Sequence, residues 1–372
     1  MRKKPANVKK KRTQKKGADT MKLDESMMAL SETATAEAQK AHSAAVGEFL
    51  DPARLRSNVV GLGVGVKWTD GQPTGEPALV VLVTQKLEKG QLSEADLVGG
   101  PKFKLGGMQT DVLAIGYPFA GGGEPLDAGV QTLAKRIRPA EGGYSVAHVK
   151  VTAGTIATCV YDILPGGTVS PPAHGIGIPP RYYILSNNHV LANSNDAALG
   201  DWILQPGPYD GGVDPADRIA RLSRFIPITF DPPVARDRHN NLVDAAVAEG
   251  PFHDLDRDIY WIGYVRGWRR KANVGVGMTV QKTGRTTNYT TGRITAISAT
   301  IDVGYGGGRV ARFKDQIVTT NISAGGDSGS LVTTLDDVAV GLLFAGSSIA
   351  TIVNQIENVR SLLKVEVAEQ IL

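Results

Sequence analysis

The chain has 372 residues, of which 42% are hydrophobic and 21% charged, so it can form two or three domains with a sizeable core. This hydrophobic content excludes wholesale disorder, and no apolar run approaches the ~18–20 residues of a membrane-spanning helix, which excludes a membrane span. The 44 glycines favour a turn-rich β protein over a helical bundle. The single cysteine, Cys159, cannot form an internal disulfide, so the fold needs no oxidising compartment, and we expect this residue in the core.

The formal net charge of +4 comes from the N-terminus. Residues 1–16 contain nine Lys or Arg and no acidic residue, and subtracting these nine charges leaves −5 on the rest of the chain. We expect residues 1–21 to form a disordered basic tail. No hydrophobic run follows it, as it would in a signal peptide, so a cytoplasmic location is predicted. A solvated arm is favoured over a nucleic-acid contact, because no stacking aromatic residues accompany the basic ones.

Helical and strand patterns follow in turn. Residues 22–50 are rich in Ala, Met, Leu, Glu, Lys and Gln and predict a helix whose alanine-rich stripe suits packing or oligomerisation. From residue 58 apolar residues alternate with glycines, the period of a β-strand. Residues 51–125 are predicted to form a small α+β domain and linker. Its parts are strands near 60–66, 78–83 and 110–115, a short helix at 92–97 and a Gly/Pro-rich connector at 117–129.

Many short strand patterns, separated by turn residues, fill the segment 126–372. They do not alternate with long helices, which argues against a parallel α/β sheet, and only residues 354–363 have a helical pattern again. The fold class predicted for this segment is mainly β, either a β-sandwich or a pair of β-barrels.

A serine in a glycine-rich turn is the first candidate for chemistry. In the segment GGDSGS at 325–330, glycines flank Ser328 and would leave its hydroxyl exposed. The backbone N–H groups of Gly326 and Ser328 are candidates for an oxyanion hole. By itself, such a turn in a glycine-rich chain is more often structural than catalytic.

A nucleophilic serine needs a base and a group that orients the base. Among the six histidines, His189 ends an apolar strand at a polar junction, and the strand-borne His148 is its only serious rival. Asp244 lies inside an apolar strand, where a carboxylate is costly to bury without a partner. Each of these residues alone is usually structural, but the succession of His189, Asp244 and Ser328 favours nucleophilic catalysis.

At these segments the chain resembles the chymotrypsin-fold (trypsin-like) serine protease superfamily. The resemblance covers about residues 126–372 and is carried by SNNHV at 186–190, LVDAAV at 242–247 and GDSGS at 326–330. More narrowly, the chain looks like bacterial relatives of the plant narrow-leaf trypsin-like protein, through NVVG at 58–61, TDV at 110–112, GRTT at 284–287 and FAGS at 344–347. The resemblance implies two antiparallel β-barrels, at about 126–268 and 269–372, with the active site between them. It also implies peptide-bond hydrolysis through an acyl-enzyme.

The chain departs from the secreted members of that superfamily. It has no disulfides, and Val190 stands where those proteins often have a cysteine beside the histidine. They are activated when a new Ile or Val N-terminus pairs with the aspartate before the serine. The sequence VVG at 59–61 lies far too early in the chain for this role, so Asp327 must find another partner. Control by oligomerisation or by a partner is therefore favoured over removal of a prosegment.

The prediction is an intracellular serine endopeptidase that acts on proteins or peptides, forms a homo-oligomer and uses no cofactor. In the superfamily the residue six positions before the nucleophile commonly lies at the floor of the primary pocket. Here it is Ile322, which predicts cleavage after small or medium uncharged side chains. The histidines lack metal-ligand spacing, so no metal site is expected. The alternatives are a catalytically silent protease-fold scaffold that binds a partner, and a nucleic-acid binder acting through the basic tail.

Overall fold

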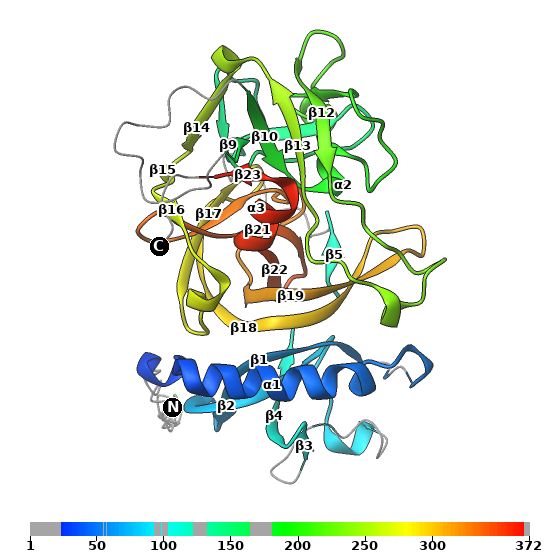
Figure 1. Cartoon of the computed structure of the whole chain (residues 1–372), viewed down its shortest axis with the longest axis vertical. Coiled ribbons are helices and arrows are strands. Elements are labelled where there is room, and N and C mark those ends of the chain that lie inside the picture. The colour runs from blue at the N-terminus through cyan, green and yellow to red at the C-terminus, as the bar shows by residue number, and fades with distance from the viewer. Residues whose placement is uncertain are drawn as a thin grey trace, which may run out of the picture.

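A computed structural model of the chain describes residues 24–54, 56, 58–92, 98, 103–121, 132–163 and 181–367. The predicted basic tail, nearly all of the predicted 92–97 helix and most of the predicted 117–129 connector lie outside these residues. The described chain is mainly β, as predicted, with its strands gathered in two large sheets and one small sheet (Figure 1). Within it, no helix combines the length and the apolar character that crossing a membrane requires.

Six strands of the larger sheet close into an antiparallel ring. Their order is β17-β20-β21-β22-β19-β18, and a further pairing of β17 with β18 completes the circle. The ring lies inside the segment that was predicted as the second barrel. Its strands are β17 (Thr279–Gly284), β18 (Asn288–Gly304), β19 (Val310–Thr320), β20 (Leu331–Thr334), β21 (Val338–Gly346) and β22 (Ala350–Gln355).

The eight-stranded sheet, in the order β23-β9-β10-β13-β12-β11-β7-β8, lies beside this ring (Figure 1). In the part of the chain that the structure describes, its outer strands β23 and β8 do not meet. The predicted first barrel is therefore seen as an open sheet and not as a closed barrel. Its strands are β7 (Ser145–His148), β8 (Gly154–Thr155), β9 (Cys159–Asp162), β10 (Tyr182–Ser186), β11 (Trp202–Leu204), β12 (Arg218–Phe225), β13 (Ala246–Gly250) and β23 (Val365–Glu366).

Short elements connect the two sheets. The predicted helix at 354–363 is observed as α3 (Ile356–Leu363), which follows β22 and packs against β21. It leads into β23, which pairs with β9, so the C-terminal segment crosses back to the eight-stranded sheet. The small sheet consists of β6 (Ala140–Gly142), β14 (Leu255–Ile259) and β15 (Gly263–Tyr264), and β16 (Gly267–Trp268) pairs with β21 of the ring.

The N-terminal strands extend the sheet of the ring. β1 pairs antiparallel with β18, and β2, β4 and β3 follow outward from it. A Cβ at Gly61 would lie 2.5 Å from the carbonyl oxygen of Thr300, so a glycine there allows β1 to approach β18. The predicted small α+β unit therefore shares one continuous sheet with the ring. Its strands are β1 (Val59–Thr69), β2 (Gln72–Val83), β3 (Lys104–Leu105) and β4 (Met108–Ala114).

The N-terminal helix is shorter than predicted. A 3-10 turn (Glu25–Met28) precedes α1 (Glu32–Phe49), which begins at Ser31 because its Oγ accepts the backbone N–H of Ala34 at 3.2 Å. α1 lies along β1 and β2 (Figure 1), and Nε2 of His42 lies 3.0 Å from the carbonyl oxygen of Leu62. The alanine-rich stripe packs onto this sheet through Ala38, Ala41 and Ala45.

Candidate active site

The structure brings His189 and Asp244 together. His189 lies in α2 (Asn188–Leu191), a single helical turn directly after β10, and Asp244 lies just before β13. Nδ1 of His189 lies 2.6 Å from Oδ2 of Asp244, and the backbone N–H of His189 donates to Oδ1 at 3.1 Å. A carboxylate only accepts hydrogen bonds, so Nδ1 carries the proton and Nε2 is free to act as a base.

A tyrosine that the sequence analysis missed completes the surroundings of Asp244. The hydroxyl of Tyr305 donates to Oδ2 of Asp244 at 2.7 Å, and the backbone N–H of Asp244 donates to Oδ1 of Asn354 at 3.0 Å. Asp244 is fully buried, and its three donors offset the cost of removing the carboxylate from water. Burial and the neighbouring Asp244 raise the pKa of Tyr305 well above its usual value, so its hydroxyl keeps its proton and stays a donor.

Ser328 lies in a tight turn that glycines make possible. Gly326 and Gly329 have φ values of +94° and +98°, in the left-handed region that favours glycine. A Cβ at Gly329 would lie 2.1 Å from Oγ of Ser186, so this side of the turn has no room for a side chain. Within the described residues, the backbone N–H groups of Gly326 and Ser328 make no hydrogen bond. The turn thus has two unengaged backbone donors, one of which belongs to Ser328 itself.

The turn holds Ser328 between the two sheets. Its carbonyl oxygen accepts the backbone N–H of Thr155, in β8, at 2.7 Å, and its Oγ lies 3.5 Å from the carbonyl oxygen of Phe344, in β21. Ser328 is only 4% exposed. Nε2 of His189 is buried and has no hydrogen-bond partner in the described chain. His189 is therefore bonded to Asp244 but not to the hydroxyl of Ser328.

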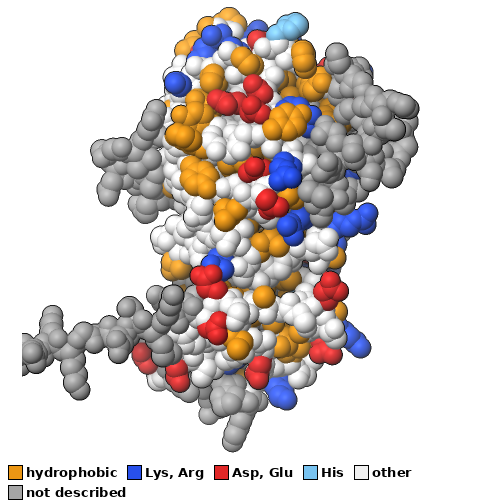
Figure 2. Space-filling view, turned by 90° about the vertical axis from the view of Figure 1, so that its left-hand side faces the viewer, with side chains coloured by type: hydrophobic (Ala, Val, Ile, Leu, Met, Phe, Trp, Pro, Cys, Tyr) orange, Lys and Arg blue, Asp and Glu red, His pale blue; other side chains and the backbone are white. Residues whose placement is uncertain are grey.

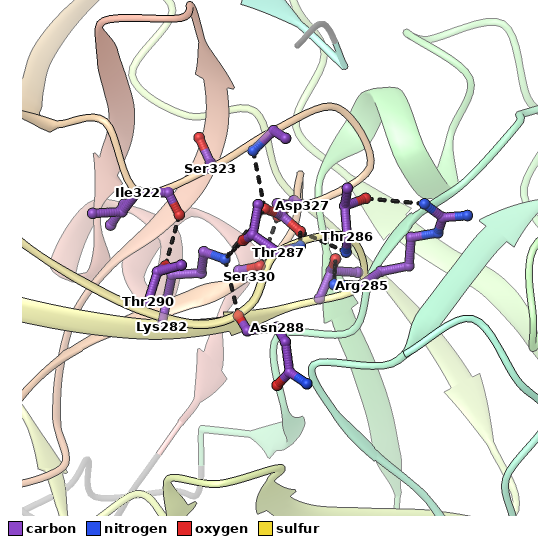
Figure 3. A network of polar contacts seen from close by, with 12 residues as sticks. Lys282, Arg285, Thr286, Thr287, Asn288, Thr290, Ile322, Ser323, Asp327 and Ser330 are labelled. Carbon is purple, nitrogen blue, oxygen red and sulfur yellow. Dashed lines mark hydrogen bonds and ion pairs between the residues drawn. The ribbon is translucent and has the colours of Figure 1, made fainter. Parts of the chain in front are cut away.

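A buried lysine holds the residue before the serine (Figure 3). Asp327 is fully buried, and its carboxylate lies 3.2 Å from Nζ of Lys282, which is fully buried too. The carboxylate also accepts hydrogen bonds from the backbone N–H groups of Thr286, at 2.8 Å, Thr287, at 3.1 Å, and Ala324, at 3.0 Å. Burial lowers the pKa of Lys282, and the charge of Asp327 opposes that shift. This lysine is the partner that the sequence analysis required for Asp327 without identifying it.

Arg285 fastens the same turn to the eight-stranded half. Its backbone N–H donates to Oγ1 of Thr155 at 3.0 Å, and that hydroxyl donates to the carbonyl oxygen of Gly326 at 2.8 Å. Its guanidinium forms an ion pair with Asp210, which raises the pKa of Arg285. The charge of Arg285 is thus already paired within the protein.

The other histidines of the described chain have structural partners or lie at the surface. Nε2 of His148, the rival base, lies 3.0 Å from Oδ2 of Asp201, and its Nδ1 accepts the backbone N–H of Lys150 at 3.1 Å. His239 also uses both ring nitrogens, one as acceptor from Arg312 and one on the carbonyl of Val234. His148 is fully buried in this arrangement and has no nitrogen left for proton transfer.

Ile322, the predicted floor of the primary pocket, is buried in the apolar core of the ring. Its backbone carbonyl accepts the hydroxyl of Thr290 at 2.7 Å, and a Cβ at Gly292 would lie 2.3 Å from its side chain.

Among the described residues, no group of three or more His, Cys, Asp or Glu is arranged to hold a metal ion. Cys159 is buried as predicted, and burial raises the pKa of its thiol to about 12.

Comparisons with known proteins point to bacterial serine proteases. No family model matches the chain. It is 36% identical over 112 residues to Serine protease 2 of Streptomyces fradiae, across 30% of this chain and half the length of that protein. Thermobifida fusca Protease A and a Nocardiopsis protease align with 61% of the chain at 15% and 16% identity, over 96% and 97% of their own lengths, each with a TM-score of 0.40.

Proposed function

We propose that the protein is a serine endopeptidase with Ser328 as nucleophile, His189 as base and Asp244 as the group that orients His189. The observation that carries this proposal is the buried His189–Asp244 pair, which leaves Nε2 of His189 without a hydrogen-bond partner in the described chain. Two backbone N–H groups in the turn of Ser328, its own and that of Gly326, are also unengaged there. Sequence similarity to a Streptomyces serine protease supports it.

In the proposed reaction, Oγ of Ser328 attacks the scissile carbonyl carbon while Nε2 of His189 takes the hydroxyl proton. Charge develops on the carbonyl oxygen, which the N–H groups of Gly326 and Ser328 stabilise. Nε2 then gives its proton to the leaving amine, the C–N bond breaks and an ester on Ser328 remains. Water, activated by the same nitrogen, hydrolyses that ester and restores the serine. Asp244 and Tyr305 keep the imidazole oriented throughout.

The substrate is proposed to be a protein or peptide cut after small or medium uncharged residues. The apolar side chain of Ile322, taken as the pocket floor, supports this preference, because burying an unpaired lysine or arginine there would be costly. A cytoplasmic setting is supported by the lone, buried Cys159. We also propose that the protein forms a homo-oligomer and that it is related to the bacterial relatives of the plant narrow-leaf protein. Nucleic-acid binding through the basic tail has less support. The face in Figure 2 carries acidic and basic side chains interspersed instead of a continuous basic surface.

A fluorophosphonate probe distinguishes the enzyme from a catalytically silent scaffold. The intact protein is incubated with the probe, and the modified residue is identified by peptide mass spectrometry. Ser328 should be labelled, the Ser328→Ala variant should not, and Ser323→Ala, which removes a hydroxyl bonded to Thr351 at 2.7 Å, should label like the native chain. The scaffold would be supported if the folded protein stays unlabelled on long exposure and the Ala120→Asp variant, designed to uncover the site, stays unlabelled as well.

A further inference from the structure

A short strand of the chain itself lies at the candidate active site. β5 (Phe119–Ala120) pairs antiparallel with the end of β21, with Ala120 opposite Ala345 and Phe119 opposite Gly346. Continuing this register by one residue places Gly121 opposite Phe344. Oγ of Ser328 lies 3.5 Å from the carbonyl oxygen of Phe344. β5 therefore pairs with the two residues of β21 that directly follow Phe344, the residue whose carbonyl oxygen lies beside Ser328.

The same segment reaches the candidate base. A Cβ at Gly121 would lie 3.7 Å from Nε2 of His189, the nitrogen that has no hydrogen-bond partner within the described residues. The side chain of His189 is only 9% exposed, and Ser328 is 4% exposed. Both reacting groups are thus buried while β5 is in place.

Several contacts anchor this segment independently of the catalytic groups. The hydroxyl of Ser347 donates to the carbonyl of Ile115 at 2.5 Å, and the backbone N–H of Gly304 donates to the carbonyl of Pro118 at 3.0 Å. Ala120 is 8% exposed and belongs to an apolar cluster with Phe344 and Ala345. Because β4 leads directly into this segment, the N-terminal strands hold β5 against the edge of β21.

An extended peptide binds a sheet by adding a strand to a free edge through main-chain hydrogen bonds. The acyl side of a polypeptide substrate of Ser328 must lie beside the serine, and β5 already fills the neighbouring edge. Gly121 has a φ of +72°, a left-handed conformation, so its own backbone is not extended as that of a bound substrate strand would be. This geometry is expected of a segment that blocks the edge of β21, and not of a substrate whose peptide bond is positioned for cleavage.

We propose that β5 is an autoinhibitory strand that occupies the substrate-binding edge of β21 and that polypeptide substrates must displace. The proposal rests on the proposed function, since it concerns the regulation of the same site. In the closed state the edge is filled from within the chain. In the open state β5 leaves and the edge of β21 from Phe344 to Gly346 becomes available to an extended peptide.

Two variants of the full chain test this. Ala120→Asp places a carboxylate in the apolar cluster and should release β5, whereas the same change at the exposed Ala272 is the matched control. Peptide cleavage by Ala120→Asp should exceed that of the native chain and of Ala272→Asp by roughly tenfold or more. A second variant with Ala120→Cys and Ala345→Cys is compared with itself, and its oxidised form should cleave peptides more slowly than its reduced form. Cys159 is buried and should not interfere.

The outcomes separate this proposal from the proposed function. Equal cleavage by the native chain and Ala120→Asp, or full activity of the oxidised double-cysteine variant, would overturn autoinhibition and leave the peptidase intact. Cleavage of the native chain after Gly121, absent from Ser328→Ala, would make β5 a substrate and would likewise overturn it. If folded Ala120→Asp is neither active nor labelled by a fluorophosphonate at Ser328, the proposed function itself fails.

Discussion

Replacing Lys282 by methionine should lower the free energy of unfolding more than a surface substitution does. Lys282 and Asp327 are both fully buried and form an ion pair at 3.2 Å. Removing one partner of a buried pair costs about 3–5 kcal/mol, because the other charge stays buried without compensation. Three backbone N–H groups and the hydroxyl of Thr287 still donate to Asp327, so we expect a loss near the lower end, about 3 kcal/mol.

The assay is urea-induced unfolding of the native and variant chains, together with peptide cleavage. Lys271→Met is the matched control, because Lys271 is 51% exposed and its pair with Asp315 should contribute only about 0–1 kcal/mol. Lys282→Met should also lose cleavage activity, since Asp327 connects the two proposed oxyanion donors. A loss of stability no larger than that of Lys271→Met, with activity retained, would refute the assigned role of the buried pair.

Four further predictions concern the site, the sheet and the helix. Single replacement of each proposed catalytic residue should lower cleavage by several orders of magnitude without adding in combination, as measured by kcat/KM for Ser328→Ala, His189→Ala and Asp244→Asn. Tyr305→Phe should weaken cleavage by roughly tenfold or more, because one buried hydrogen bond to the orienting carboxylate is lost; unchanged kcat/KM would refute this. Gly61→Ala should destabilise the fold by roughly 1–3 kcal/mol in urea unfolding through its clash with the β18 backbone, whereas Gly47→Ala, with open space around it, should be neutral or stabilising. Burial lowers the pKa of His42 below 6.5, so below that pH His42 is protonated in the unfolded chain before it is protonated in the folded chain. Stability should fall with decreasing pH by up to about 1.4 kcal/mol per unit, and His42→Gln should flatten that dependence.

The sequence predicted those parts of the site that have a local signal. The sequence places His189 at the end of an apolar run, Asp244 inside one and Ser328 among glycines. The structure holds His189 and Asp244 at 2.6 Å, and the catalytic roles of all three residues stay predictions. Tyr305 and Lys282 have no comparable signal. They reach the site through strand pairing within the ring, and a single sequence does not specify which distant strands pair.

The same limit explains the differences in the fold. Alternation of valines and glycines predicted the strand at 60–66, but not that Gly61 would bring it against β18. The predicted helix at 22–50 is divided because Ser31 caps α1, a choice that composition alone does not make. β5 consists of Phe119 and Ala120 only, too short for any period, and its place beside Ser328 depends on pairing with β21.

Product analysis with a chain in which β5 is released tests directly whether the protein is a serine endopeptidase that β5 inhibits. Ala120→Asp and the double variant that adds Ser328→Ala are incubated with a complex peptide mixture, and the new termini are identified by mass spectrometry. New cleavage products, mainly after small or medium uncharged residues, are expected from Ala120→Asp and none from the double variant. Equal products from both chains, or none from a folded Ala120→Asp chain, would contradict it.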